Sequence, residues 1–253
     1  IEAALEKVRS RSLAMHKSDE IKEVVKTVVE KIKELDIEMN GGVSLVTFSP
    51  GSKDLLHWIW IPEQFDEPLK AALPYFDNIM FHDCNEGREK GFELVARVYS
   101  GEEKRNYFEH IFNRSGFSAA TDDLKSWVMG QEYFGFSFAI QQHSNIIISD
   151  YTRKYFSDET NDILIRFSKV FEQSYIRFVD LQKSEAQTRE AQIELSLERV
   201  RAKTMAMHNS ADVGETVATM FDELVHLGVV TNRCGVLVID ETKHMEVWTA
   251  KSN

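Results

Sequence analysis

His82 and Cys84 are the residues whose types and spacing come nearest to metal chemistry. They form a His-x-Cys pair, and both side chains can bind zinc or haem iron. A structural metal site needs about four ligands, and no second pair lies nearby in the sequence. We therefore interpret Cys84 as a partly exposed thiol beside a surface histidine. No Ser-His-Asp set, carboxylate pair or phosphate-binding loop follows from the spacing, so the sequence predicts no enzyme and requires no cofactor.

Aromatic residues at strand spacing offer a binding site of another kind. Because ligand pockets are mostly apolar with a few placed polar groups, these aromatic side chains could line a pocket for a small molecule. The aromatic candidates are Trp58, Trp60, Phe134, Phe136 and Phe138, and the polar candidates are His57, His82 and Arg97. The same alternation is typical of plain core packing, and the sequence leaves both interpretations open.

Two β-hairpins would carry most of these candidates. Residues 42–48 and 55–61 flank the turn signal Ser49-Pro50-Gly51-Ser52 and predict the first hairpin. Residues 132–141 and 145–149 predict the second, in which one face is aromatic and the other small. Residues 92–100 predict a further strand.

Helical patterns surround these strands. The predicted helices cover residues 21–35, 102–114, 122–130 with Thr121 as its N-cap, 212–227, and an uninterrupted helix from residue 158 into the second copy of a repeat. Between 67 and 89 the pattern is mixed, and we expect a short helix, an irregular piece around Pro74 and then another helix.

The repeat is a segment of 21 residues that occurs twice, 192 positions apart. IEAALEKVRSRSLAMHKSDEI (1–21) and IELSLERVRAKTMAMHNSADV (193–213) are identical at ten of 21 positions. The period is the size of a domain, which predicts one whole unit and the start of another. Ser18 and Ser210 then offer N-caps for the helix that follows each copy.

Within each copy, apolar positions recur at steps of 4, 3, 4 and 3. This heptad spacing keeps an apolar seam facing a partner helix, and it predicts a homodimer through these helices. A helix face buried within the chain itself remains the alternative. The seam residues are Ile1, Leu5, Val8, Ser12 and Met15 in the first copy, and Ile193, Leu197, Val200, Thr204 and Met207 in the second.

Net charge and composition limit the kinds of binding partner and the cellular compartment that we expect for this protein. The net charge is −11, with 30 Lys and Arg against 41 Asp and Glu, which argues against nucleic acid. Two cysteines make no disulfide scaffold and fit the reducing cytoplasm. No apolar run is long enough to span a membrane, so we expect no membrane contact. Because the chain begins at Ile1 inside a helical pattern, we expect a piece of a longer protein.

The order of helix, hairpin, helices, hairpin and long exit helix resembles a GAF-type sensor domain. The segments ALEKVRSRSLAMHKSDEI and LSLERVRAKTMAMHNSADV, the latter preceded by KVFEQSYIRFVDLQKSEAQTREAQIE, are similar to the repeated linkers of multi-domain sensor histidine kinases of the Bacteroidetes type. The resemblance implies an α+β fold, in which a GAF-like antiparallel sheet is flanked by helices, with long coiled-coil linker helices at both ends. It divides the chain into a linker end (1–18), a GAF-like sensor domain (19–175), a signalling helix (176–210) and a truncated second domain (211–253).

Several family features are missing from the sequence. The NKFDE signature of cyclic-nucleotide-binding GAF domains has no counterpart, and Cys84 lacks the context of a bilin-attachment cysteine. The resemblance therefore implies a non-catalytic sensory and relay region of a signalling protein, with an unidentified small-molecule ligand. The alternative is a ligand-free scaffold that sets spacing and dimerises.

Overall fold

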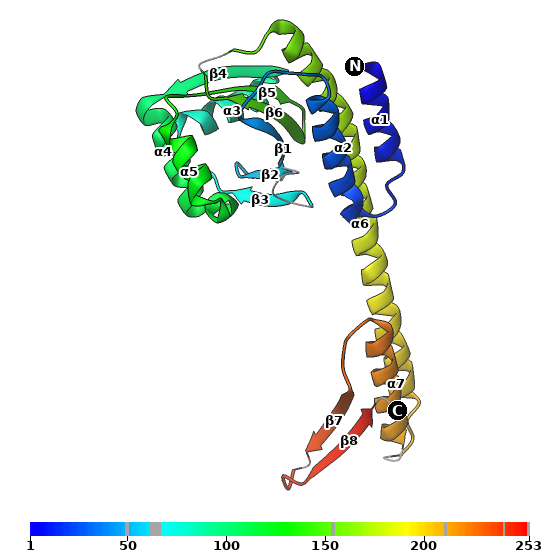
Figure 1. Cartoon of the computed structure of the whole chain (residues 1–253). Coiled ribbons are helices and arrows are strands. Elements are labelled where there is room, and N and C mark those ends of the chain that lie inside the picture. The colour runs from blue at the N-terminus through cyan, green and yellow to red at the C-terminus, as the bar shows by residue number, and fades with distance from the viewer. Residues whose placement is uncertain (49–50, 61–66, 153–154, 210–211, 240, 252–253) are drawn as a thin grey trace. The chain divides into compact units, whose positions relative to one another are not determined.

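The computed structural model describes residues 1–48, 51–60, 67–152, 155–209, 212–239 and 241–251 (Figure 1). The chain divides into two compact units, Ile1–Leu181 and Gln182–Asn253. The first unit combines a six-stranded antiparallel sheet with helices. The predicted α+β fold class, a GAF-like antiparallel sheet flanked by helices, is therefore confirmed.

The sheet of the first unit has the strand order β3-β2-β1-β6-β5-β4, and every neighbouring pair is antiparallel. At its centre, Leu45 of β1 lies opposite Trp58 of β2 on one side and Ile146 of β6 on the other. The strands are β1 (Gly42–Phe48), β2 (Leu55–Ile59), β3 (Leu69–Leu73), β4 (Leu94–Ser100), β5 (Tyr133–Ile140) and β6 (Ser144–Asp150).

Both predicted hairpins are present, as β1–β2 and β5–β6, and the predicted third strand is β4. Ser49, Pro50 and Ile61 lie outside the described residues. The short helix expected from residue 67 is wrong, because Leu69–Leu73 forms strand β3 at the sheet edge and pairs with β2. The second helix expected in that region is present as α3.

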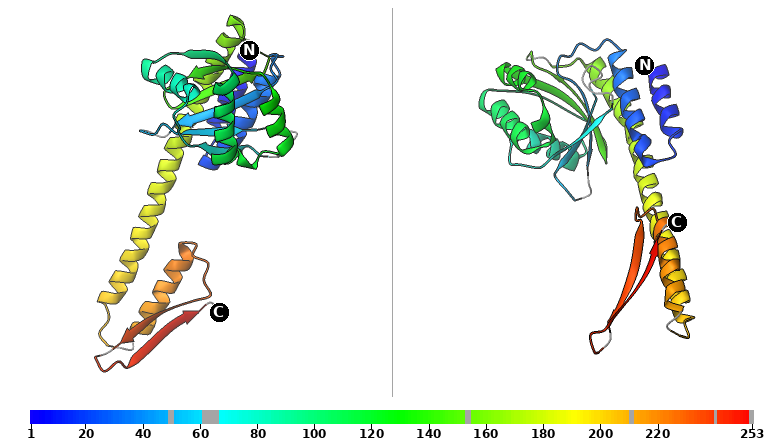
Figure 2. Two further views of the ribbon diagram at one scale, coloured as in Figure 1. Left: turned by 90° about the vertical axis from the view of Figure 1, so that its left-hand side faces the viewer. Right: turned by 60° about the horizontal axis from the view of Figure 1, so that its bottom comes forward.

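Helices cover both faces of this sheet (Figure 2). One face carries α2 (Ile21–Lys33) and the first part of α6 (Asp158–Met205), and α1 (Glu2–Leu13) packs against these helices on the side away from the sheet. The short η1 (Ser18–Glu20) lies between α1 and α2 in the chain. The other face carries α3 (Ile79–Lys90), α4 (Gly101–Arg114), the short η2 (Gly116–Ala119) and α5 (Asp122–Gly130). Thr121 caps α5 as predicted, since its Oγ1 accepts the Leu124 N–H at 3.3 Å.

Two buried clusters lie on the opposite faces of the sheet, because successive residues of a strand point to opposite sides. The cluster beneath α1, α2 and α6 includes Leu45, Trp58 and Ile146 from the strands and Phe167 and Phe171 from α6. The cluster beneath α3–α5 draws on aromatic side chains, among them Phe81, Phe108, Phe136 and Phe138.

The first copy of the repeat folds back on its own unit instead of presenting a free seam. Helix α1 packs beside α2, and Leu5, Val8 and Met15 are buried in the cluster beneath the helices. Arg177 of α6 also donates two hydrogen bonds, at 2.8 and 3.2 Å, to the Met15 carbonyl. The assignment of these three residues to a dimer seam is therefore wrong, and the alternative of an intramolecular helix face holds. Ile1 is exposed.

The turn that ends each copy uses a carboxylate. In the first copy the His16 N–H donates to Glu20 Oε2 at 3.1 Å, and in the second the His208 N–H donates to Asp212 Oδ2 at 2.7 Å. Ser18 begins η1, and the residue before α2 is Glu20, so Ser18 is not the predicted N-cap of α2. Ser210 lies outside the described residues.

The second unit contains the end of α6, helix α7 (Asp212–His226) and a hairpin of β7 (Arg233–Ile239) and β8 (Met245–Lys251). A buried Glu223 of α7 accepts hydrogen bonds from Ser196 at 2.7 Å and from Arg199 at 3.1 Å, and these bonds hold α7 against α6. Within this unit Leu197 and Thr204 are exposed, whereas Ile193, Val200 and Met207 are half-buried.

Helix α6 has 48 residues, as the uninterrupted pattern after residue 158 predicts. Within the described part of the chain, no helix combines the length and apolar character that crossing a bilayer requires.

Candidate ligand cavity

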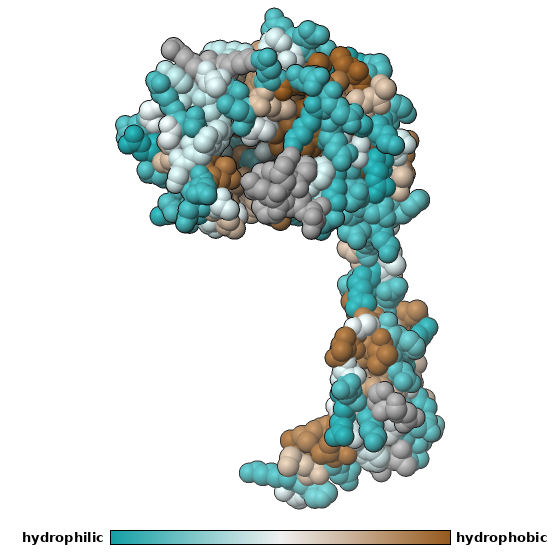
Figure 3. Space-filling model, in the orientation of Figure 1, coloured by the Kyte–Doolittle hydropathy of each residue, from teal (hydrophilic) through white to brown (hydrophobic). Residues whose placement is uncertain are grey.

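A cavity of about 150 Å³ lies in the first unit, between the sheet and helices α3 and α4. The space-filling view shows this unit hollowed beside α4 and α5, with hydrophobic side chains in the wall (Figure 3). The lining residues are Gly41, Ser44, Leu55, His57, Met80, Phe81, Cys84, Tyr107, Phe108, Ile111, Phe117, Phe134, Phe136, Ile147, Ser149 and Tyr151.

Strand alternation determines which sheet residues reach the cavity. On β5, Phe134 and Phe136 face it, while Ser137 and Ala139 point to the opposite face. Ile147 and Ser149 of β6 have the same relation to the buried Ile146 and Ile148 of the other cluster. The sheet therefore contributes one row of side chains from each of its central strands.

The helical wall depends on two close approaches of backbone to sheet. A Cβ added at Gly87 of α3 would lie 2.6 Å from Ile140 Cδ1, so only glycine lets α3 pack this closely. A Cβ at Gly116 would lie 2.8 Å from Ala71 Cβ of β3. The second approach places Phe117 beside His57, with ring centroids 5.4 Å apart in an edge-to-face contact.

Aromatic rings make contact with one another around the cavity. Tyr107 of α4 stacks over Phe134 of β5 with centroids 6.4 Å apart, and Phe108 meets the same Phe134 ring edge-to-face at 5.0 Å. Phe81 of α3 lies 6.3 Å from Tyr107. Such pairs fix ring orientations beyond what apolar burial alone would do, which gives the cavity defined walls.

A second hollow of about 310 Å³ shares six wall residues with the first. It extends toward α5 and the start of β1, where Trp60, Leu124 and Trp127 contribute to its lining. The shared residues are Gly41, Ser44, Phe108, Ile111, Phe117 and Tyr151.

His57 is the most unusual group in the cavity. His57 is 6 % exposed, and neither of its ring nitrogens has a hydrogen-bond partner among the described residues. Burial disfavours the charged imidazolium and lowers the pKa of His57 from 6.5 to about 4. Unpartnered buried polar groups are rare in proteins and often mark sites with a function.

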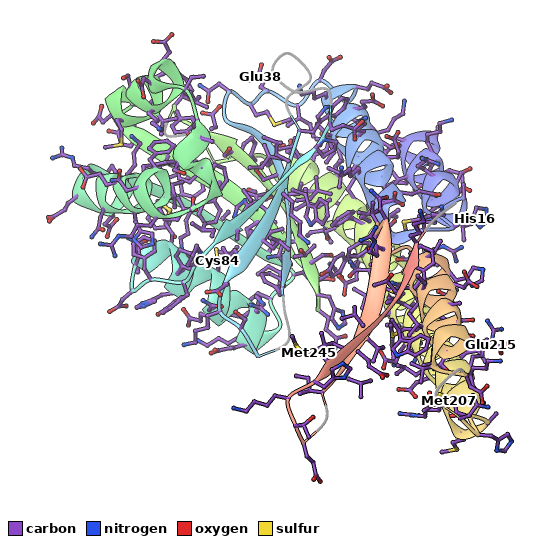
Figure 4. All side chains as sticks on the ribbon, turned by 90° about the horizontal axis from the view of Figure 1, so that it is seen from below. His16, Glu38, Cys84, Met207, Glu215 and Met245 are labelled. Carbon is purple, nitrogen blue, oxygen red and sulfur yellow. The ribbon has the colours of Figure 1, made fainter. Side chains whose placement is uncertain are left out.

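The other titratable groups of the cavity are also uncharged at neutral pH. Burial, together with the charge of Asp83, raises the pKa of the Cys84 thiol to about 12. Burial likewise raises the pKa values of the Tyr107 and Tyr151 hydroxyls. Cys84 sits on α3 (Figure 4) and is buried, so its interpretation as a partly exposed thiol is wrong.

The structure brings only some of the predicted pocket residues together. His57, Phe134 and Phe136 line the cavity, and Trp60 lines the second hollow. Phe138 is buried in the same cluster without lining either space. The aromatic face predicted for β5 therefore contributes to the core and to the cavity at once.

Three predicted pocket residues lie elsewhere. Trp58 follows His57 on β2 and so points to the opposite face, where its indole N–H donates to Thr47 Oγ1 at 3.2 Å. The side chains of His82 and Arg97 are 52 % and 49 % exposed, and they pair with Asp77 at 2.6 Å and with Asp83 at 3.3 Å. Their inclusion in the pocket is wrong, because both side chains are half exposed to solvent and have carboxylate partners outside the cavity.

Several lining residues were not predicted, namely Cys84, Tyr107, Phe108, Phe117 and Tyr151. Tyr107 and Phe108 belong to a helical apolar stripe, which indicates burial without indicating what the stripe covers. In the described residues, no group of three His, Cys, Asp or Glu side chains is placed to hold a metal ion.

Comparison with known proteins finds similarity among solved structures alone. No family model matches the chain, and no curated protein matches it. Among solved structures, the chain is similar to the bacteriophytochrome RpBphP3 from the photosynthetic bacterium R. palustris, with 9 % identity, a TM-score of 0.44 and coverage of 99 % of this chain. The chain spans about half of that structure, 49 % of its length. The fold of the first unit is described by its own antiparallel sheet and the helices that flank it.

Proposed function

We propose that this chain is a non-catalytic sensory and relay region of a multi-domain signalling protein, and that the parent protein is a cytoplasmic sensor histidine kinase. The first unit senses a small molecule in its cavity, and α6 passes the change onward. The observation that carries this proposal is that β5 and β6 line the cavity with one face and pack beneath α6 with the other.

Neighbouring residues of β5 and β6 alternate between the two faces of this hairpin, so the cavity wall and the contact with α6 are one residue apart. Phe136 and Ile147 line the cavity, while Ala139, Ile146 and Ile148 share a buried cluster with Phe167 and Phe171 of α6. Close-packed side chains transmit small displacements because no free volume absorbs them. A shift of the hairpin caused by a ligand would therefore reach α6.

Polar contacts add a second connection between the hairpin and α6. Glu172 of α6 accepts the His143 N–H at 2.9 Å and the Ser144 hydroxyl at 2.6 Å, both at the turn between β5 and β6. At the end of β5, the Gln141 side chain donates to Ser168 of α6 at 3.0 Å. These bonds fix the turn to one position along the helix.

The relay would act by shifting a population between two arrangements of α6 and its dimer partner. In the first unit, Phe171 and Phe178 of α6 are buried in the cluster against the sheet. The heptad pattern begins again at Ile193. The step of twelve positions from Leu181 to Ile193 matches neither one heptad nor two, and we propose that the bistable step lies there.

The dimer part of this proposal predicts opposite outcomes for the two copies of the repeat. Replacing Leu197 and Val200 with Asp should abolish dimerisation in sedimentation velocity while leaving the fold intact, because Leu197 is 43 % exposed and Val200 is only half-buried. The matched change at Leu5 and Val8 should instead destabilise the first unit by at least about 3 kcal/mol, because it buries unpaired charge. A dimer that survives L197D/V200D would refute the seam.

The relay is tested by changing the phase of α6. The full chain is placed ahead of a dimeric histidine-kinase core, and one to seven residues are inserted between Lys183 and Gln192. We expect autophosphorylation to vary with insertion length and to return at seven residues, which restores the heptad phase. A flat response would support the ligand-free scaffold instead.

A further inference from the structure

We propose that the cavity binds a neutral, planar aromatic or heteroaromatic molecule of one or two rings that hydrogen-bonds to His57. This inference rests on the proposed sensory function and names the chemistry of its ligand.

The size of the space fits one ring, with room for a second. An engineered apolar cavity of about 150 Å³ in another protein holds one benzene molecule. The first cavity here has about that volume, and the neighbouring hollow of about 310 Å³ shares six of its walls. A ligand could therefore extend past Phe108 and Tyr151 into the second hollow.

The walls favour flat, polarisable ligands. Seven Phe and Tyr rings line the first cavity, and Tyr107, Phe108 and Phe134 already contact one another in stacked and edge-to-face geometry. An added ring would find both faces and edges to pack against, and each aromatic pair contributes about 0.5–1.5 kcal/mol beyond the burial of area.

The first cavity disfavours a charged ligand. No Asp, Glu or Arg occurs among the described residues that line either space, and Lys33 of the second hollow is the single lysine among them. Within the first cavity, His57, Cys84 and the two tyrosines are uncharged at neutral pH. A charged group placed in the first cavity would thus lose its hydration without gaining a partner, which costs several kcal/mol.

His57 supplies the polar anchor. A neutral imidazole carries one donor and one acceptor nitrogen, and both nitrogens of His57 are buried without partners among the described residues. A ligand ring with an N–H or a ring nitrogen would satisfy one of them. The gain is large because the protein has already lost the hydration of this group.

The test compares indole with indene, which has the same shape but no N–H. We expect isothermal titration of the full chain to give indole an affinity about tenfold higher than that of indene, from one buried hydrogen bond. His57→Leu should remove this difference, and His57→Gln, which keeps a donor and an acceptor, should retain part of it. His82→Leu is the matched control and should change nothing, because His82 is exposed and outside the cavity.

Equal affinities of indole and indene for the unmodified chain would overturn the role of His57, whatever the variants do. Binding of neither compound, or tighter binding of the anionic indole-3-acetate than of indole, would overturn the ligand class. The insertion series in α6 needs no ligand, so it would still judge the relay. Indole that binds as expected without changing kinase output would refute sensing while leaving this ligand chemistry intact.

Discussion

Glu172→Ala is expected to lower the free energy of unfolding by about 3 kcal/mol, because the Glu172 side chain of α6 holds the turn between β5 and β6. The residue is 8 % exposed, and its carboxylate accepts from the His143 N–H, from His143 Nδ1 at 2.8 Å and from the buried Ser144 hydroxyl. Alanine would leave the buried Ser144 hydroxyl and the part-buried His143 N–H without an acceptor, and each buried unsatisfied donor costs about 1–3 kcal/mol. The His143 ring, whose side chain is 41 % exposed, would be hydrated instead. Chemical denaturation of the full chain measures the change.

Glu93→Ala provides the control for this prediction. Glu93 pairs at 2.7 Å with Lys169, which lies in α6 like Glu172. Both side chains are more than half exposed, so removing the Glu93 carboxylate should cost less than about 1 kcal/mol. Glu172→Gln should fall between the two, because its amide oxygen can still accept the His143 N–H. If Glu172→Ala were no more destabilising than Glu93→Ala, the turn would not be held by this carboxylate.

His57→Leu is expected to stabilise the protein, and to do so more strongly as the pH falls. At pH 7 the substitution removes an unpartnered buried imidazole, which is neutral or favourable for stability. Below its ordinary pKa of 6.5, the histidine is protonated in the unfolded chain but stays neutral in the folded one until about 4. Protonation therefore favours unfolding, and stability is lost as the pH falls from 6.5 toward 4.

The size of this effect follows from the shift in pKa. Between pH 7 and pH 5 the unmodified chain should lose about 2 kcal/mol that the His57→Leu variant keeps, at 1.36 kcal/mol per unit of pH below 6.5. Urea denaturation of both proteins at the two pH values gives the difference directly. A constant gap between them would mean that His57 is hydrated or paired in the folded chain.

The sheet was largely predictable because its strands obey local rules. Alternating aromatic and small residues in Tyr133–Ile140 fix both the strand and its two faces, and the sequence predicts each hairpin correctly. Strand β3 was missed because Leu69–Leu73 reads LKAAL, whose residues are good helix formers. Its pairing with β2 and the burial of Ala71 and Leu73 override that preference.

The site was less predictable than the sheet. The sequence places His57 on a strand but does not show whether its ring nitrogens have hydrogen-bond partners. Cys84 reaches the cavity only because Gly87 lets α3 approach β5, and this approach is not visible in the sequence. The repeat shows the same limit. Heptad spacing predicts that an apolar stripe is buried but not what buries it. Either a partner chain or α2 of the same chain could bury Leu5 and Val8.

Helix α6 also affects how the protein can be cut for study. Domain boundaries usually fall in exposed linkers, but the boundary between the two units, after Leu181, lies inside a continuous helix of 48 residues. A truncation there would leave four carbonyl groups of the last turn without their helical partners and would fray the turns that carry Phe178 and Arg177. Expression fragments of the first unit should therefore extend several turns past Leu181, and a shorter fragment would report the behaviour of its damaged end.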